Sequence, residues 1–515
     1  MRRSWSRTGL LPGLAVAWAA AAGAQSAPPD LSGAMHWRSI GPTRAGRARA
    51  LAGVTSQPNV FYIGFDNGGV WRSTDYGSTW EPLFDREPTG SIGAIGVAQA
   101  DPNVIYVGSG AGIIRPDLAT GLGVYKSTDA GKTWTRLGLP DSRMIANIEV
   151  DLTDPDRLFV AVLGHPYGPN AERGVFRSTD GGRTFEKVLY KDEYTSANEV
   201  RIDPGDFRTI YAALWEQQQS FNEGAGFGGS GGTGGIYKST DGGDTWKQLT
   251  EGLPPVLQAN LAIAPGNSKV LYAIVAPAPP GAPAVAAGGP APGPGAGGGG
   301  PGAIGIYKST DGGEHWFLAA RGPDPQDGAA ARAPDPRPLA RIGGGDLPTL
   351  AVDPKDENVV YSASVVLWRT EDGGVTWSAV RGAPGGDDYQ KIWINPGNAD
   401  ILLAVSDQGA VISANRGKSW SNWYTQPTAA MYHVTSDNAF PYRVCGGQQD
   451  SGSACVESRS MDGQITFHAG IRPTSRSTAW RRRIPGIRTW CTAACATTCP
   501  STIAGPARPR WWVPT

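Results

Sequence analysis

The chain has 515 residues, and its 46 basic side chains are balanced by 46 acidic ones. This balance excludes a global electrostatic field that would attract nucleic acid or an acidic membrane surface. The 72 Gly, 42 Pro and 18 Trp residues, with only 18% charged residues, are typical of a turn-rich all-β protein rather than a helical one. All five Cys residues lie at or after Cys445, so the body of the protein neither relies on disulfides nor contains a thiolate metal site.

The N-terminus has the pattern of a secretory signal peptide. Arg2, Arg3 and Arg7 precede an apolar stretch from about Leu10, which ends in a small-residue cleavage site at residues 22–24. A membrane anchor would need a longer unbroken apolar span. We therefore expect a signal peptide at 1–24, a spacer at 25–35, and a mature protein that is secreted or periplasmic and has no transmembrane segment.

Residues 36–430 are organised by one repeated unit, Ser-x-Asp-x-Gly-x-Thr-Trp, which follows a short alternating apolar run. The first copy runs from Ser73 to Trp80, the third ends in Phe185, and a degenerate seventh copy ends at Trp420. Such a fixed unit indicates a repeat architecture. The repeated acidic residues are Asp75, Asp129, Asp180, Asp241, Asp311 and Asp372, and the repeated Trp residues are Trp80, Trp134, Trp246, Trp316, Trp377 and Trp420.

Each repeat also contains further strand-like segments. Runs such as 104–107 and 359–362 follow Asp-Pro or similar turns, and short apolar segments such as 92–97 and 145–150 supply another strand. No segment has a helical period. The sequence therefore predicts an all-β fold, a β-propeller of four-stranded blades. Seven copies of the repeated unit, which we call the box, are visible. A larger ring, of which these copies are an incomplete part, stays an open alternative. Three Gly/Pro-rich interruptions are expected to be loops on blade rims, at residues 221–235, 276–303 and 321–346.

The repeated box has a structural logic. Its Asp can accept hydrogen bonds from backbone N–H groups two residues further on, while the Gly takes the left-handed conformation. The Trp then buries a large face between neighbouring blades. We therefore interpret the six box Asp residues as structural, although their number resembles a set of catalytic carboxylates.

After the seventh box, residues 431–467 begin another repeat, and the sequence then changes character. Residues 468–515 contain Arg but no Lys, Asp or Glu, and Cys491, Cys495 and Cys499 cluster there. No nearby His completes a metal site. We interpret 468–515 as an aberrant, disordered tail produced by out-of-frame translation, which resequencing of the gene would test.

The Ser-x-Asp-x-Gly-x-Thr-Trp boxes resemble those of the BNR or Asp-box repeat superfamily, over about Trp37 to Trp420. The phrases at residues 37–42, 164–175 and 442–450 are most similar to bacterial secreted proteins with a sortilin N-terminal (Vps10-like) β-propeller, often labelled glycosyl hydrolases. Such proteins usually continue well beyond the point where this sequence changes character.

A second resemblance, to xyloglucanase-type glycoside hydrolases, suggests candidate site residues. Those enzymes place a catalytic Asp in a Thr-Asp-x-Gly-Gly-x-Tyr phrase after the first strand, and residues 65–71 are similar. The resemblance implies Asp66 as one catalytic carboxylate and Asp450 as its distant partner, because glycosidic cleavage needs two. Turn capping by both Asp residues stays an open alternative. The candidate ligand-binding residues are Asn67, His165, Gln448 and Gln449.

No Ser/His/Asp nucleophile arrangement, phosphate-binding Gly loop or metal-spaced His set is present, so we expect no cofactor and no metal. The leading interpretation is a secreted scaffold that binds a protein, a peptide or a glycan, with no nucleic-acid partner. The alternative is a xyloglucanase-type glycoside hydrolase that uses Asp66 and Asp450. A propeller that assists assembly of a membrane complex has the same fold, and the sequence does not separate it from these two.

Overall fold

The computed structural model describes residues 38–113, 119–216, 234–278, 304–321, 339, 347–383, 385–449, 452–461, 463–465, 470–471, 480–483 and 490–493. The predicted signal peptide and spacer lie outside these residues, and so do most of the three Gly/Pro-rich interruptions. Residues Ile40–Thr515 form one compact unit that contains every sheet described below.

Seven antiparallel sheets follow one another along the chain, and we number them as blades 1 to 7. Six have four strands in the described residues and blade 7 has three. The strands are β1 (Ala48–Val54), β2 (Gln57–Phe65), β3 (Val70–Ser73) and β4 (Glu81–Pro82) in blade 1; β5 (Ile92–Val97), β6 (Ile105–Ser109), β7 (Val124–Ser127) and β8 (Thr135–Arg136) in blade 2; β9 (Ile145–Val150), β10 (Leu158–Val162), β11 (Gly174–Ser178) and β12 (Glu186–Leu189) in blade 3; β13 (Thr195–Asp203), β14 (Asp206–Glu216), β15 (Gly235–Ser239) and β16 (Lys247–Leu249) in blade 4; β17 (Val256–Ile263), β18 (Leu271–Pro277), β19 (Gly305–Ser309) and β20 (Phe317–Arg321) in blade 5; β21 (Thr349–Val352), β22 (Val360–Ala363), β23 (Leu367–Thr370) and β24 (Ser378–Arg381) in blade 6; and β25 (Tyr389–Ile394), β26 (Leu402–Ser406) and β27 (Gly409–Ser413) in blade 7.

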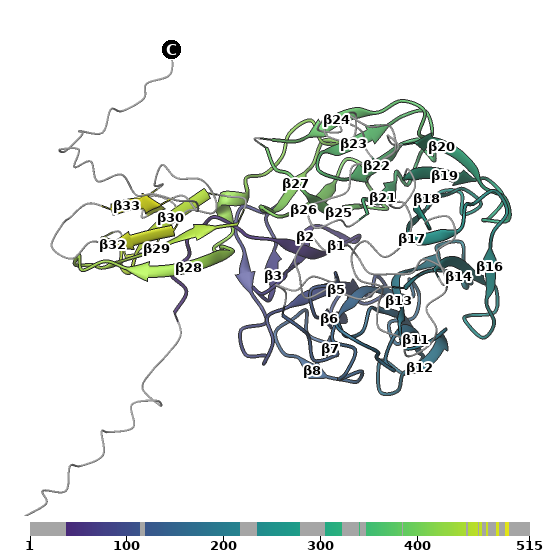
Figure 1. Ribbon diagram of the computed structural model, residues 1–515, viewed down its shortest axis with the longest axis horizontal. Helices are drawn as coiled ribbons and strands as arrows, with labels where there is room; N and C mark the ends of the chain where they lie inside the picture. Colours follow the sequence, from purple (N-terminus) through teal and green to yellow (C-terminus); the bar gives the residue numbers. More distant parts are fainter. Residues whose placement is uncertain are drawn as a thin grey trace, which may run out of the picture. The chain divides into compact units, whose positions relative to one another are not determined.

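The first strand of every blade lies at the centre of a closed ring (Figure 1). Strands β1, β5, β9, β13, β17, β21 and β25 contact one another in that order, and β25 contacts β1. The ring therefore closes with seven blades. Of the alternatives that the sequence left open, the described blades form the closed ring of seven, in which blade 7 packs directly against blade 1.

An eighth sheet follows a short 3-10 helix, η3 (Trp423–Thr425). Its strands are β28 (Met431–Ser436), β29 (Arg443–Gln448), β30 (Gly452–Glu457) and β31 (Gly470–Ile471). Cys445 and Cys455 are directly opposite in β29 and β30 and form a disulfide. In the predicted tail, the structure describes β31, β32 (Trp480–Arg483) and β33 (Trp490–Ala493), and its out-of-frame origin stays a prediction.

The Asp-box turns are built from the Asp itself. In the first box, Asp75 accepts hydrogen bonds from the Thr79 backbone N–H at 2.9 Å and from the Thr79 hydroxyl at 2.6 Å. The Asp thus caps an N–H group four residues further on, rather than two as expected, because the Ser73 hydroxyl occupies the nearer position and accepts from Gly77 N–H at 2.8 Å. Gly77 has a φ of 81°, the left-handed conformation that the motif predicts.

The same contacts recur in the other boxes and fix the charge state of their carboxylates. The side-chain hydrogen bond from Thr133, with the Thr133 backbone N–H second, lowers the pKa of Asp129 to about 2. The corresponding bond from Thr184 lowers the pKa of Asp180 to about 2. These carboxylates are bound within their own hairpins.

The box Trp residues pack between blades. Trp316, in the box of blade 5, is 4% exposed and lies in a cluster with Tyr211 and Leu249 of blade 4. Trp80 of blade 1 packs with Leu403 and Ile412 of blade 7, so the same contact closes the ring. Burial of an aromatic ring between blades explains why one aromatic residue recurs in every box.

A basic residue directly before the first Ser or Thr of the box, in the strand that enters it, links several blades to the next. Lys238 of blade 4 donates to the Gly312 carbonyl of blade 5 at 2.8 Å, and Arg177 of blade 3 donates to the Gly242 carbonyl of blade 4 at 2.8 Å. This link between blades was not predicted from the sequence. Its signal was present in the repeated Arg-Ser or Lys-Ser dipeptide of the box.

Candidate functional site

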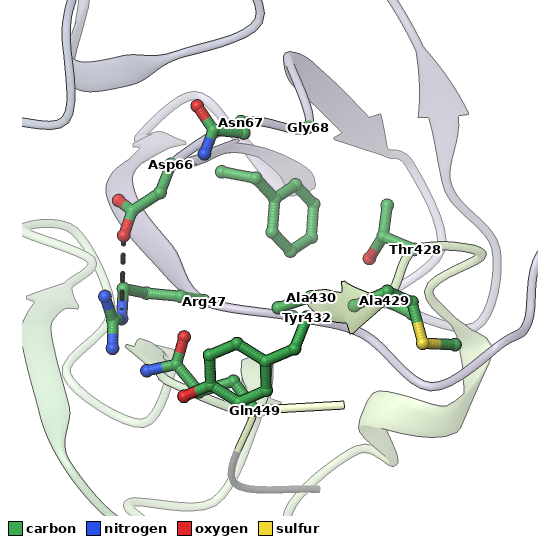
Figure 2. Close-up of a pocket in the computed structure, with 12 residues that line it drawn as sticks. Arg47, Asp66, Asn67, Gly68, Thr428, Ala429, Ala430, Tyr432 and Gln449 are labelled. Atoms are coloured by element: carbon green, nitrogen blue, oxygen red, sulfur yellow. Dashed lines mark ion pairs between the residues drawn. The ribbon is translucent and has the colours of Figure 1, made fainter. Parts of the chain in front are cut away.

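A pocket of about 420 Å³ lies where β2 ends, just before β1 begins and where β28 begins. We call it the entry pocket. Figure 2 shows Asp66 and Asn67 on one side of it and Tyr432 and Gln449 on the other. The lining residues are Gly46, Arg47, Phe65, Asp66, Asn67, Gly68, Thr428, Ala429, Ala430, Met431, Tyr432 and Gln449.

Asp66 is placed by the end of β2. Its backbone N–H donates to the Arg47 carbonyl at 3.1 Å, and the N–H of Phe65 donates to the Gly69 carbonyl at 3.0 Å, which closes a tight turn. Gly69 has a φ of 74°, which explains the second Gly of the Asp-Asn-Gly-Gly phrase. The turn aims a carboxylate that is 5% exposed at the entry pocket.

Arg47 compensates the buried charge of Asp66. Its Nε lies 3.5 Å from Asp66 Oδ2, and both side chains are less than a tenth exposed. Arg47 also binds Asp407 with two hydrogen bonds, of 2.9 and 2.7 Å, and Gln390 donates to Asp407 at 2.9 Å. A buried cation between two carboxylates is a strongly held arrangement, because removal of any member leaves an uncompensated charge.

The opposite wall comes from the eighth sheet. Gln448 is buried, and its amide donates to the Ala45 carbonyl at 2.6 Å, which joins β29 to the segment before β1. Gln449 donates its backbone N–H to the Ala430 carbonyl at 2.8 Å and lines the entry pocket. Asp450, the next residue, lies outside the described residues.

The structure separates His165 from the other candidate residues. His165 lies in the loop between β10 and β11, where its Nε2 is 2.9 Å from Asp141 Oδ1. Asn170 also hydrogen-bonds Asp141, at 3.0 Å, so His165 belongs to a local polar cluster. Of the predicted site residues that are described, Asp66, Asn67 and Gln449 line the entry pocket, and Gln448 lies just behind it.

Sequence reasoning missed the residues that support the site. Arg47, Asp407 and Gln390 belong to no motif that the sequence analysis identified. Glu199 lies in the middle of β13, is 4% exposed and pairs with Arg201 at 2.9 Å. The pairing of Arg47 with Asp407 joins residues 360 positions apart, so no sequence interval signals it.

The chemistry of the entry pocket is that of a polar, partly aromatic site. A carboxylate, a guanidinium, two amide side chains and a phenol surround the pocket, and such groups bind hydroxyl-rich ligands by hydrogen bonds. Asp66 is the one carboxylate among its described lining residues. Within the described part of the chain, no cluster of His, Cys, Asp and Glu is suited to hold a metal, and no helix has the length and apolar character for a membrane crossing.

A closed ring of antiparallel blades with Asp-box turns defines the chain as a β-propeller protein. Comparison with known proteins agrees. The family model Sortilin-Vps10, described as sortilin, neurotensin receptor 3, matches residues 122–259. The predicted resemblance to sortilin-type propellers that are often labelled glycosyl hydrolases is confirmed by this match and by the relatives described next.

The chain is similar in sequence to xyloglucanases. A probable oligoxyloglucan-reducing end-specific xyloglucanase from Neosartorya fischeri is 26% identical over 445 residues, which cover 80% of this chain and 49% of that protein. The xyloglucanase Xgh74A of Acetivibrio thermocellus is 25% identical over 229 residues, which cover 38% of this chain and 24% of that protein. This chain thus spans about half the length, or less, of these two relatives.

Solved structures show the same fold. The GH74 xyloglucanase from Xanthomonas campestris has a TM-score of 0.58 at 18% identity, covering 85% of this chain and 63% of that one. The GH74 enzyme of Niastella koreensis has a TM-score of 0.56 at 18% identity, covering 88% and 67%. The predicted β-propeller fold class is therefore confirmed.

Proposed function

We propose that this chain is the propeller portion of a glycoside hydrolase of xyloglucanase type, with Asp66 as one of its two carboxylates. The sequence likeness to xyloglucanases favours this function over the binding scaffold, which was the leading interpretation from the sequence alone. The single observation that carries the proposal is the position of Asp66, which follows β2 and lines the entry pocket together with Asn67 and Gln449.

The proposal assigns separate tasks to the pocket residues. Asp66 acts on the glycosidic bond, with Arg47 holding its carboxylate in place through the 3.5 Å contact. Asn67, Gln449 and Tyr432 bind sugar hydroxyls. Asp450 supplies the second carboxylate that cleavage requires, from the position directly after Gln449. The polysaccharide substrate and the export of the protein from the cytoplasm are part of this proposal.

The binding scaffold is the second candidate, and one observation favours it. Asp66 is the sole carboxylate among the described lining residues, and one carboxylate suffices for binding but not for hydrolysis. In this function the same pocket retains a xyloglucan chain without cutting it.

Incubation of the full chain with xyloglucan and with a mixed-linkage β-glucan separates the two candidates. If the chain hydrolyses xyloglucan, new reducing ends appear. The rate of their release is then expected to fall at least 100-fold in Asp66→Asn, since loss of one carboxylate removes a chemical role. Asp85→Asn, an exposed carboxylate of the same blade, is the matched control and leaves the rate unchanged. Retention of xyloglucan in affinity electrophoresis without new reducing ends supports the scaffold. If the chain neither releases reducing ends nor retains xyloglucan, both candidate functions are refuted.

A further inference from the structure

A second cavity opens at the other end of the central strands. Its volume is about 230 Å³, and it is lined near its mouth by residues after the ends of β1, β5, β9 and β25, namely Thr55, Gln99, Leu152 and Pro396. We call it the channel pocket. Arg47, in the entry pocket, lies just before β1 begins, whereas the channel pocket is reached where β1 ends.

The floor of the channel pocket is a group of charged side chains from different blades. Arg201 of β13 pairs with Glu149 of β9 at 2.5 Å and with Glu199 at 2.9 Å. Lys391 of β25 reaches across the ring and donates to the Ala146 carbonyl of β9 at 2.8 Å. Lys391 lines the channel pocket and also a smaller cavity, which Arg49 and Glu199 line as well. The charged group therefore lies between these two cavities.

Lys391 differs from Arg201 in its partners. Arg201 is held by two carboxylates, whereas Lys391 forms no ion pair with a described residue and its hydrogen-bond partner is a carbonyl. Burial, followed by the repulsion of Arg49 and then of Arg201, lowers the pKa of Lys391 to about 7, against the opposing attraction of Glu199 and Glu149. Glu149 and Glu199 both pair with Arg201, so a protonated Lys391 can take an anionic partner from a ligand.

Part of the wall of the channel pocket is apolar, while Gln99, Asn147 and Thr349 supply polar lining. Trp393 lines it beside Leu51, and Leu152 at the mouth is 43% exposed. Gly53 lies directly under the indole, where a Cβ would overlap the ring of Trp393. An aromatic wall above a cationic floor suits a ring that carries one carboxylate. At about 30 Å³ per water, the cavity has the space of seven or eight waters, enough for one such ring.

We propose that the channel pocket binds a small ring-bearing monocarboxylate, with its carboxylate on Lys391 and its ring against Trp393. Nothing in the proposed hydrolase activity requires this site, so its test is independent of the entry pocket. An aromatic acid and a sugar acid share this chemistry, and the two sources are separated by comparing benzoate with glucuronate.

The proposed contact couples binding to protonation. An anion beside Lys391 favours its charged form, so binding takes up a proton when the pH lies above about 7. Affinity is then full below pH 7 and falls roughly tenfold per pH unit above it. Burial also raises the pKa of Glu149, and protonation of that carboxyl at lower pH changes affinity in the same direction.

Isothermal titration of the full chain with benzoate, glucuronate and the neutral isostere benzamide at pH 6 and pH 9 tests the site. We expect binding of at least one acid at pH 6, at least tenfold weaker binding at pH 9, and no binding of benzamide at the same concentrations. The acid that binds more tightly shows whether the ligand is an aromatic acid or a sugar acid. Absence of binding by both acids, or equal binding of benzoate and benzamide, overturns the proposal.

Two variants locate the site. Lys391→Met removes the amine at nearly constant volume and is expected to lower affinity at least tenfold and abolish its pH dependence, whereas Lys132→Met, at an exposed box turn, leaves both unchanged. Leu152→Asp places a like charge at the exposed mouth and also weakens binding, and it tests the site if Lys391→Met fails to fold. Unchanged affinity in a folded Lys391→Met, or in Leu152→Asp, refutes the assignment.

Discussion

Replacement of Trp316 by Ala tests the claim that box indoles hold the ring together. Trp316 is 4% exposed, its indole N–H donates to the Gly313 carbonyl at 2.9 Å, and it packs against Tyr211 and Leu249 of the preceding blade. The substitution leaves a cavity between blades 4 and 5 and does not change the turn itself, because the box Asp and Gly remain.

The structure sets the size of the expected effect. An indole buries roughly 150–250 Å², which at about 25 cal/mol per Å² corresponds to about 4–6 kcal/mol. The Ala side chain keeps a small part of this contact, and Trp-to-Ala substitutions in cores cost about 3–5 kcal/mol. We therefore expect Trp316→Ala to lower the free energy of unfolding by about 3–5 kcal/mol.

Urea unfolding followed by far-UV circular dichroism measures this loss. The matched control is Val375→Ala in the next box turn, where the side chain is 73% exposed and the expected change is about 0.5 kcal/mol or less. If Trp316→Ala shifts the unfolding midpoint no more than Val375→Ala does, the indole does not hold the blades together, and our account of the repeat is wrong.

Three further predictions follow from other contacts. Arg47→Met leaves two buried carboxylates without their cation and should destabilise the chain by about 3–5 kcal/mol in urea unfolding. The pKa of Asp129, about 2, lies below its unfolded value of about 3.9, so its contribution to stability is present above pH 4 and is lost as the pH falls through 2. Asp129→Asn should therefore be less stable at pH 7 and lose less stability on acidification. Lys238→Met removes the link to Gly312 between blades 4 and 5 and should cost about 1 kcal/mol of thermal stability.

Each of these predictions has a specific control. Arg86→Met, at an exposed position of blade 1, should leave the urea midpoint unchanged, and an equal loss in both Arg variants would contradict the role of the buried pair. An acid unfolding curve of Asp129→Asn with the wild-type shape would mean that the box carboxylate does not titrate as described. Lys132→Met should retain the wild-type melting temperature, and the same temperature for Lys238→Met would show that the blade link is energetically neutral.

The sequence by itself determined the repeated hairpin and its chemistry. Every contact of the Asp-box turn is local, because Ser73, Asp75 and Thr79 lie within one turn and the φ of Gly77 is set there too. Local contacts leave a pattern at fixed intervals, so the blade, its four strands and the interior position of its Trp could be predicted. The position of Asp66 at the end of a strand was predictable for the same reason.

Tertiary structure alone decided the number of blades, the partners of Asp66 and the charged floor of the channel pocket. Closure depends on whether β25 meets β1, which the angle between successive blades sets and no residue interval encodes. Arg47 and Asp407 are separated by 360 positions, and Lys391 and Ala146 by 245, so their pairing exists only once the ring is closed. The physical reason is that a repeat fixes each blade from within, whereas the site residues face a centre that all the blades create together.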